Sequence, residues 1–464
     1  MSLPARSPID LGSRRELFID DFLIAEQRGT TLRLQTPWPA PLSAGAFADA
    51  GYATVIAENA GAEGCGPRCH AWYRAYAPGY PLTAESTYDG NPGEYTAYMH
   101  SPDGVNWTRP SLGLYDLGGS RENNAVLAGL PPFSHNFSPM LDTRPGVNPA
   151  QRFKALAGVH HSGLHAFASP DGLRWRPLSA EAVVKSEPFA FDSQNVSFWS
   201  PAESCYVCYH RSWLFAREGQ FEGALRSISR RTSPDFLHWS AELPLRPNLP
   251  GEHLYTSQTA PYFRAPHLYI ALPTRFLPER GESTDILLMT SRPCQRGPGF
   301  TRAFREAFIR PGPDPARWGN RSNYAALNLL PTGPGEMSLY LSSNSVKEAG
   351  RRLVLRTDGF ASLHAGWEGG EMRTHPLTFS GSRLELNYAA SAAGSLQVEL
   401  QTPAGEPLPG YSLAECPAIV GDQVARLVCW QGGEDLSSLA GRPLRLRFVL
   451  RDADLYSLCF TNPS

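Results

Sequence analysis

The sequence predicts an all-β fold, a five-bladed β-propeller followed by a C-terminal β-sandwich. Three observations predict it: a turn signature with a period of about sixty residues, many short strand-like runs, and a change of pattern near residue 350. The 464 residues exceed what one hydrophobic core usually serves, so two domains are expected. Glycine and proline number 42 each, and so many turn formers favour short strands over long helices.

The recurring signature begins with Ser-Pro-Asp and ends at a tryptophan four residues after the aspartate. Its copies end at Trp107, Trp175 and Trp239, and a degraded fourth copy has Phe300 in that place. The aspartate and the glycine that usually follows it build a tight turn, and the aromatic residue opens the next strand. Each repeat contains about four short strands, which is one propeller blade. The predicted blades are residues 50–110, 122–178, 190–241, 253–310 and 322–346.

The fifth predicted blade is short, so the ring needs additional strands to close. Residues 17–24 (LFIDDFLI) and 31–35 (TLRLQ) are expected to supply them, which makes residues 1–346 the propeller domain. Strict alternation places one of Asp20 and Asp21 inward. That residue would be catalytic in an innermost strand and structural in a closing strand, and we favour the closing strand.

The character of the chain changes after the last blade. Residues 350–464 contain alternating apolar and polar runs joined by glycine-containing turns, and the Ser-Pro-Asp signature is absent from them. Seven or eight short antiparallel strands of this kind are typical of a β-sandwich or jelly roll. We therefore expect a sandwich domain that spans these residues.

Composition and charge exclude several classes of protein. The formal net charge of −2 offers no basic surface for nucleic acid or an anionic membrane, and no apolar run is long enough to span one. The N-terminus has no run of signal-peptide length, so a cytoplasmic location with reduced cysteines is expected. Cys205 and Cys208 stand three apart in a strand and face opposite ways, so we expect no metal and no cofactor. The sequence leaves the oligomeric state open.

Candidate functional residues are the polar side chains that open the first strand of each blade, because these strands begin at the central channel. Cleavage of a glycosidic bond needs one carboxylic acid to protonate the leaving oxygen and one carboxylate to attack or to activate water. The candidate catalytic acids are Asp142, Asp192, Glu252 and Glu336. Asp142 and Asp192 occupy equivalent places on neighbouring blades, and either glutamate would be the proton donor. The candidate substrate-binding residues are Asp49, His135, Asn136, Gln194, Asn195, His253, Tyr255 and Asn323.

Several of these segments also resemble a known group of proteins. LFIDDFLI, the Ser-Pro-Asp turns, LDTRP, FDSQNVSFW and the pattern of residues 350–464 are similar to bacterial proteins related to invertases, levanases and arabinanases, glycoside hydrolase families 32, 43 and 68. The resemblance covers nearly the whole chain. It implies a five-bladed propeller with three acidic residues in a central funnel: a nucleophile or base, a transition-state stabiliser and a proton donor.

Three functions are compatible with the sequence. The favoured one is a glycoside hydrolase that acts on an oligo- or polysaccharide. The alternatives are a non-catalytic carbohydrate-binding propeller and a propeller polysaccharide lyase, for which His135, His253 and Tyr255 are residues of the right type. Two carboxylates facing each other across the funnel at about 5–10 Å would favour hydrolysis, and a single acid would argue against it.

Overall fold

The computed structural model describes residues 7–48, 50–58, 68–81, 92–185, 190–216, 222–319, 322–342 and 350–463. The chain divides into two compact units. The larger unit is Pro37–Val354, and the smaller unit combines Met1–Thr36 with Leu355–Ser464.

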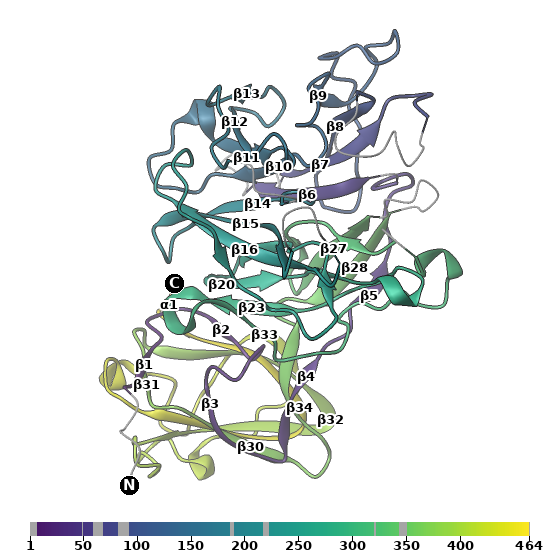
Figure 1. Cartoon of the computed structure of the whole chain (residues 1–464). Helices are drawn as coiled ribbons and strands as arrows, with labels where there is room; N and C mark the ends of the chain where they lie inside the picture. The colour runs from purple at the N-terminus through teal and green to yellow at the C-terminus, as the bar shows by residue number, and fades with distance from the viewer. Residues whose placement is uncertain are drawn as a thin grey trace. The chain divides into compact units, whose positions relative to one another are not determined.

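Within the described residues, the larger unit contains six antiparallel sheets, and the five that have at least four strands follow one another along the chain (Figure 1). The first is β6 (Gly51–Glu58), β7 (Arg68–Tyr76), β8 (Glu94–Ser101) and β9 (Ala125–Ala128). The second is β10 (Ser138–Leu141), β11 (Phe153–Ala157), β12 (His165–Ser169) and β13 (Arg176–Pro177). The third is β14 (Val196–Ser200), β15 (Cys205–Leu214), β16 (Leu225–Ser233) and β17 (Leu243–Pro244).

The last two sheets are less regular than the first three. The fourth is β19 (Thr259–Tyr262), β20 (Ala265–Ala271), β23 (Met289–Arg292) and β24 (Gly297–Thr301). The fifth is β25 (Tyr324–Ala325), β26 (Leu330–Gly333), β27 (Glu336–Ser342), β28 (Arg351–Arg356) and β5 (Trp38–Ala40). A three-stranded sheet is added by β18 (His253–Leu254), β21 (Thr274–Leu277) and β22 (Ser283–Ile286). The helical segments of this unit are α1 (Pro293–Arg296) and the 3-10 turns Pro149–Gln151, Pro278–Arg280 and Pro315–Arg317.

The first strands of the sheets lie next to one another around a common axis. β6 contacts β10 and β25, β10 contacts β14, and β14 contacts β19. A parallel bridge joins Thr54 to Leu327. Such packing of successive sheets through their first strands is the arrangement of a propeller, and the predicted all-β class is confirmed.

The Ser-Pro-Asp signature forms the turn that the sequence predicts. In the first copy, the Ser101 hydroxyl accepts the N–H of Gly104 at 2.9 Å, and Asp103 Oδ1 accepts the N–H groups of Val105 and Asn106 at 2.8 Å. The indole N–H of Trp107 donates to the Gly104 carbonyl at 3.0 Å. The copies that end at Trp175 and Trp239 repeat these bonds. The aspartates of the signature are therefore turn formers.

The second copy also holds neighbouring sheets together, and this contact gives a test of the repeat. Trp72 of the first sheet donates its indole N–H to the Gly172 carbonyl at 2.7 Å. A Cβ on Gly172, whose φ is +73°, would stand 2.7 Å from the Trp72 ring. We expect Gly172→Ala to lower the free energy of unfolding by about 2–4 kcal/mol, from backbone strain together with overpacking.

The matched control is Gly146→Ala. Gly146 has the same φ of +73°, and a Cβ added to it would meet no atom within 4 Å. Only the strain of about 1 kcal/mol should be lost there. Urea unfolding of both variants measures the difference, and equal losses would contradict the packing role of the turn.

The predicted closure of the ring by residues 17–24 and 31–35 is wrong. β2 (Glu16–Leu17) pairs with β34 (Arg445–Thr461), β3 (Ile24–Arg28) with β30 (Gly370–Thr374), and β4 (Thr30–Leu34) with β29 (Ala361–Ala365). These N-terminal strands lie in the smaller unit because their apolar side chains complete its core, where Phe18 packs edge-on against Phe448. The fifth sheet takes β5 as its outer strand instead.

Asp20 and Asp21 therefore belong to the smaller unit and not to the larger unit that contains the propeller-like sheets. Asp20 is buried, and its Oδ1 accepts the backbone N–H of Phe22 at 3.1 Å, as a turn former does. The predicted domain boundaries move accordingly, from 1–346 and 350–464 to the two units given above.

The smaller unit is an eight-stranded antiparallel sheet around its own core. Its longest strands, β32 (Arg383–Gln401) and β34, pair along most of their length with register shifts near Tyr388 and between Ala390 and Ser395. β33 (Asp422–Leu427) extends this sheet, while β1 (Ile9–Asp10) and β31 (Leu377–Thr378) pair separately. The predicted sandwich stays a prediction, since the hydrogen bonds join these strands into one continuous sheet.

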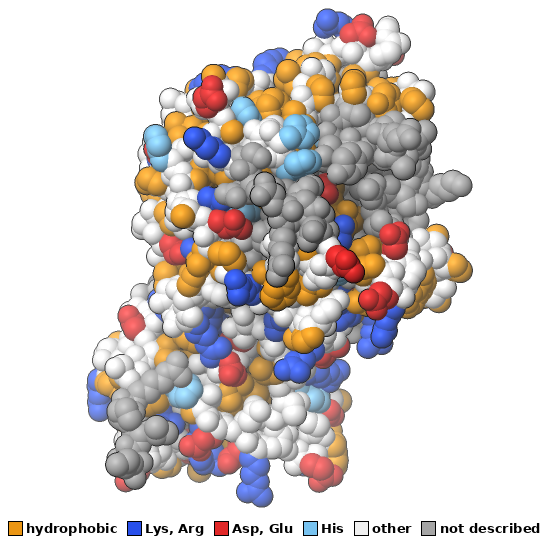
Figure 2. Space-filling view, viewed as in Figure 1, with side chains coloured by type: hydrophobic (Ala, Val, Ile, Leu, Met, Phe, Trp, Pro, Cys, Tyr) orange, Lys and Arg blue, Asp and Glu red, His pale blue; other side chains and the backbone are white. Residues whose placement is uncertain are grey.

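The surface agrees with the balanced composition. On the face shown in Figure 2, acidic and basic side chains are interspersed over both units. Within the described part of the chain, no helix is long and apolar enough to cross a membrane.

Candidate functional site

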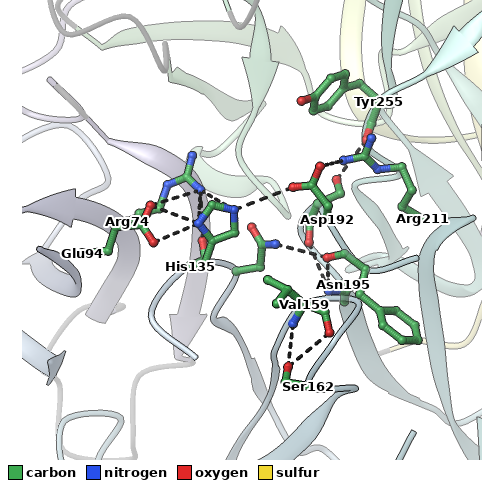
Figure 3. A network of polar contacts seen from close by, with 12 residues as sticks. Arg74, Glu94, His135, Val159, Ser162, Asp192, Asn195, Arg211 and Tyr255 are labelled. Atoms are coloured by element: carbon green, nitrogen blue, oxygen red, sulfur yellow. Dashed lines mark hydrogen bonds and ion pairs between the residues drawn. The ribbon is translucent and has the colours of Figure 1, made fainter. Parts of the chain in front are cut away.

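A cluster of charged and aromatic side chains lies where the sheets of the larger unit begin their first strands. Its charged members lie in the loops before β10 and β14 and on the second and third strands of the sheets, and Figure 3 shows most of them. They are Arg74, Glu94, His135, Asp192, Arg211 and Arg226, with Tyr52, Tyr255 and Tyr324 packed beside them. We call this set the axial cluster.

Asp192 is the partly exposed carboxylate of the axial cluster and lies between His135 and Arg211 (Figure 3). Its Oδ2 is 3.1 Å from Nη2 of Arg211, and its Oδ1 is 3.7 Å from Nε2 of His135. Burial alone would raise the pKa of Asp192, but the positive charge of Arg211 and the contacts with His135 and Arg74 outweigh it and hold the pKa below its usual value. At neutral pH this carboxylate is therefore ionised, and it can accept a proton or attack an electrophile.

His135 is held in place by Glu94. The Nδ1 atom of His135 is 2.9 Å from a Glu94 carboxylate oxygen, and the Glu94 side chain has no exposed surface. Burial would raise the pKa of Glu94, but the hydrogen bond with His135 and the charge of Arg74 lower it. An ionised carboxylate only accepts, so Nδ1 of His135 carries the proton of this bond and Nε2 faces Asp192.

The guanidinium groups of the cluster stack on aromatic rings. Arg74 lies 4.8 Å from the centre of the Tyr52 ring, and Arg211 lies 4.5 Å from that of Tyr255. Burial and the nearby Tyr255 and Asp192 raise the pKa of Tyr52. The site is thus lined by flat apolar rings and fixed positive charges, which suits a ligand with both an apolar face and polar substituents.

The loop that carries Asp192 is held in place by the buried side-chain amides of two asparagines. Asn136 and Asn195 each donate from Nδ2 to the Phe191 carbonyl at 3.1 Å. Phe191 has a φ of +68°, a strained value for a residue other than glycine, directly before Asp192. Both asparagines were predicted to bind substrate, but they are fully buried and serve to position the loop instead.

Gln194 has a similar structural role beneath the cluster. Its Nε2 donates to Thr54 Oγ1 at 2.7 Å, and its Oε1 accepts from Gln258 Nε2 at 2.7 Å. Gln258 also donates to the Ala325 carbonyl at 2.6 Å. These two glutamines form hydrogen bonds between neighbouring sheets at the axis. Gln194 is buried in these bonds, so the structure gives it a structural role in place of the predicted contact with substrate.

A pocket of about 410 Å³ opens beyond these glutamines, along the later residues of the first strands. It is lined mostly by apolar side chains such as Met140, Trp199 and Tyr262, and the described residues of its lining include no acid, histidine, lysine or arginine. Such a pocket offers no group for proton transfer near neutral pH. The axial cluster, rather than this pocket, is the candidate active site.

Three of the four predicted catalytic acids do not join Asp192. Each is instead paired with a different cation, Asp142 with Lys154, Glu252 with Arg302 and Glu336 with Arg352. Asp142 also accepts the hydroxyl of Tyr206 at 2.6 Å and the N–H of Arg144 at 3.0 Å, which makes it a buried turn former. Among the described residues, no hydrogen bond or ion pair joins any two of the four acids.

The other predicted binding residues divide into two groups. His253 and Tyr255 lie beside Arg226, whose backbone N–H donates to His253 Nδ1 at 3.2 Å. Asn323 is buried, and its side chain donates to the carbonyls of Thr284 and Arg317, so it is structural. Asp49 lies outside the described residues.

Sequence reasoning missed Tyr52, Arg74, Glu94, Arg211 and Arg226 as members of the axial cluster. Most of them lie on second or third strands, whereas only polar openings of first strands were considered. β7 runs antiparallel to β6, so Arg74 at its end pairs with Gly51 at the start of β6. An arginine inside an otherwise mostly apolar strand, such as Arg74 in RCHAWYRAY or Arg211 in CYVCYHRSWL, was the available signal.

Among the described residues, no group of three or more histidine, cysteine, aspartate or glutamate side chains is arranged to hold a metal ion. The fold and site together define an all-β protein of propeller architecture with an arginine-rich axial site. No protein-family model and no curated protein matches the chain.

Several solved structures are similar to the chain. A family 43 arabinoxylan arabinofuranohydrolase from Bacillus subtilis matches with a TM-score of 0.44 and 14% identity, over 89% of this chain and 96% of that one. A fructofuranosidase from Schwanniomyces occidentalis matches with a TM-score of 0.37 and 9% identity, over 98% and 99%. An N-acetylgalactosamine deacetylase from F. plautii matches with a TM-score of 0.43 and 12% identity, over 71% and 96%. These likenesses are weak and carry no activity from those enzymes to this chain.

Proposed function

We propose that the five sheets form a five-bladed propeller and that the chain is an enzyme that cleaves a glycosidic bond at the axial cluster. One observation carries the proposal: an ionised, partly exposed carboxylate, Asp192, lies between an imidazole and a guanidinium where the first strands begin. A reactive carboxylate beside a possible proton carrier is what acid–base cleavage of an acetal needs.

The roles follow from the geometry. Asp192, held ionised by Arg211, attacks the anomeric carbon or takes a proton from water. In its doubly protonated form, with Nδ1–H bonded to Glu94, His135 donates the proton on Nε2 to the leaving oxygen. Glu94 acts through His135, because its buried carboxylate holds Nδ1 and fixes the orientation of the ring.

This arrangement differs from the pair of facing carboxylates expected from the sequence. Asp192 is partly exposed, whereas Glu94, the other carboxylate of the axial cluster, is enclosed behind His135. By the criterion taken from the sequence, a single exposed acid argues against hydrolysis by two carboxylates. The proposal therefore gives the role of the second acid to the imidazole of His135. Catalysis by one carboxylate and one histidine also permits β-elimination, which the tyrosines beside Arg74 and Arg211 favour as a second candidate.

The test is a screen of the purified protein and its His135→Gln variant against aryl glycosides and oligosaccharides. New reducing ends should appear with the wild-type protein, and the variant should release them about a hundredfold more slowly or worse, because a proton donor is lost. Glutamine can still donate to Glu94, so the fold should survive. Products with a new carbon–carbon double bond would indicate elimination, and wild-type protein without product on every saccharide would overturn the proposal.

A further inference from the structure

Arg226 is an arginine of the axial cluster to which the proposed cleavage assigns no role. Its guanidinium lies 4.7 Å from the centre of the Trp213 ring, 5.1 Å from that of Tyr255 and 5.3 Å from that of Phe276. Among the described residues it forms no ion pair with a carboxylate, and its one side-chain polar contact is His253 Nδ1 at 3.5 Å. An arginine held in this way is costly unless an anion shares the site.

Arg211 is also incompletely satisfied. Its side chain is 1% exposed, and none of its three guanidinium nitrogens makes a hydrogen bond within the described residues. Asp192 compensates its charge from 3.1 Å but occupies only one edge of the group. The planar guanidinium has five N–H donors, so further acceptors can be accommodated.

The strand register brings these groups together on one sheet. Arg211 and Trp213 are two positions apart on β15, so their side chains share a face of the sheet. Trp213 lies directly opposite Arg226 on β16. Tyr255 contacts both guanidinium groups, at 4.5 Å from Arg211 and 5.1 Å from Arg226. His253 accepts the backbone N–H of Arg226 on Nδ1, so its Nε2 is the nitrogen that carries the proton of the neutral ring.

Among the described residues, the charges of the axial cluster do not balance. Three guanidinium groups, Arg74, Arg211 and Arg226, face the two carboxylates of Glu94 and Asp192. Glu279, an exposed acid, influences His253 electrostatically but forms no ion pair with Arg226. The excess charge lies on the Arg226 side, next to the partly exposed ring of Trp213 and the buried ring of Phe276.

We propose that the axial cluster takes a saccharide with an anionic substituent, a carboxylate or a sulfate ester, and that Arg226 and Arg211 bind this group. The inference rests on the proposed function for the saccharide itself, and it adds the charge of the substrate. Arginine suits planar, bidentate recognition of such oxyanions, and burial among aromatic rings strengthens the contact.

The experiment is calorimetric titration with three probes: an oligogalacturonate, the same oligomer with its carboxyl groups reduced, and the reduced oligomer carrying a sulfate ester. Wild-type protein should bind one or both acidic probes at least about tenfold more tightly than the neutral one, and salt should weaken this preference. The carboxylate and sulfate arms identify the anion. Equal affinity for all three probes would overturn the inference.

Variants of single arginines test whether the preference for acidic probes depends on Arg226. Arg226→Gln should bring the affinity for the acidic probes down to that for the neutral probe, while Arg226→Lys should retain part of the preference. Arg174→Gln, which removes an arginine that is 70% exposed, is the matched control and should bind like the wild type. An undiminished preference in a folded Arg226→Gln protein would overturn the assignment.

The outcomes separate this inference from the proposed function, because binding is measured without cleavage. Tight binding of an acidic probe with no product from any saccharide would leave the anionic site standing and reject the enzyme. Efficient cleavage of neutral saccharides, with no faster cleavage of acidic ones, would support the enzyme and reject the anionic site.

Discussion

Replacing Asp192 with asparagine should lower kcat/KM by about a thousandfold on whichever saccharide the wild-type protein cleaves. The amide has nearly the same shape as the carboxylate, and its oxygen can still face Arg211, which lies 3.1 Å away in the wild-type protein. What disappears is the negative charge that attacks carbon or takes a proton from water. Steady-state kinetics of the variant measure the effect.

The control for this variant is Asp116→Asn. Asp116 accepts the N–H of Gly119 at 2.8 Å in an exposed turn, so its replacement should leave kcat/KM unchanged. Added formate or azide should restore part of the activity of Asp192→Asn if the missing group is the catalytic carboxylate. A folded Asp192→Asn protein with wild-type activity would remove Asp192 from the mechanism.

The turn signature allowed most of the fold to be predicted. Its bonds are local: Asp103 bonds to residues two and three positions later, and Trp107 to a carbonyl three positions earlier. Local bonds leave a pattern in the sequence, and the regular spacing of the pattern predicts the sheets. The degraded copy before Phe300 still marks a sheet, formed by β23 and β24, although its turn is irregular.

The N-terminal strands show where such reasoning fails. LFIDDFLI has the alternation of a strand, but alternation does not say which partner a strand has. Phe18, Phe22 and Leu23 are buried in the core of the smaller unit, and only this long-range packing decides the pairing. Residues 17–24 and 31–35 could be predicted as apolar and partly extended, but not assigned to a sheet.

The site was predicted in part for a related reason. His135, Asp192 and Tyr255 belong to it, because loops before first strands do reach the axis. Arg74 and Arg211 belong to it because antiparallel second strands return to the same end, as the pairing of Arg74 with Gly51 shows. Asp142 occupies a position that looked equivalent to Asp192, yet Lys154 and Tyr206 enclose it. Only the packing between sheets separates these two aspartates.

Replacing Arg211, the cation next to Asp192, should change the pH dependence of the reaction. The pKa of Asp192 is below its usual value of about 3.9 because the charge of Arg211, with His135 and Arg74, outweighs the opposing effect of burial. In Arg211→Gln the largest of these charges is gone, so the pKa of Asp192 should rise. Since the reaction needs the ionised form, the acid limb of the kcat/KM profile should move to higher pH by about one unit.

Stability should follow the same linkage. A carboxylate with a depressed pKa in the folded state stabilises the protein above its unfolded pKa, and this contribution is lost as the pH falls toward the folded value. The gap in unfolding free energy between wild type and Arg211→Gln should therefore be widest at neutral pH and narrow below about pH 4. Arg174→Gln, whose exposed partner is Asp171, should shift neither the acid limb nor this gap. An Arg211→Gln protein with an unmoved acid limb would mean that His135 and Arg74 alone keep Asp192 ionised, and the reactive carboxylate would then depend on the His135 side of the cluster.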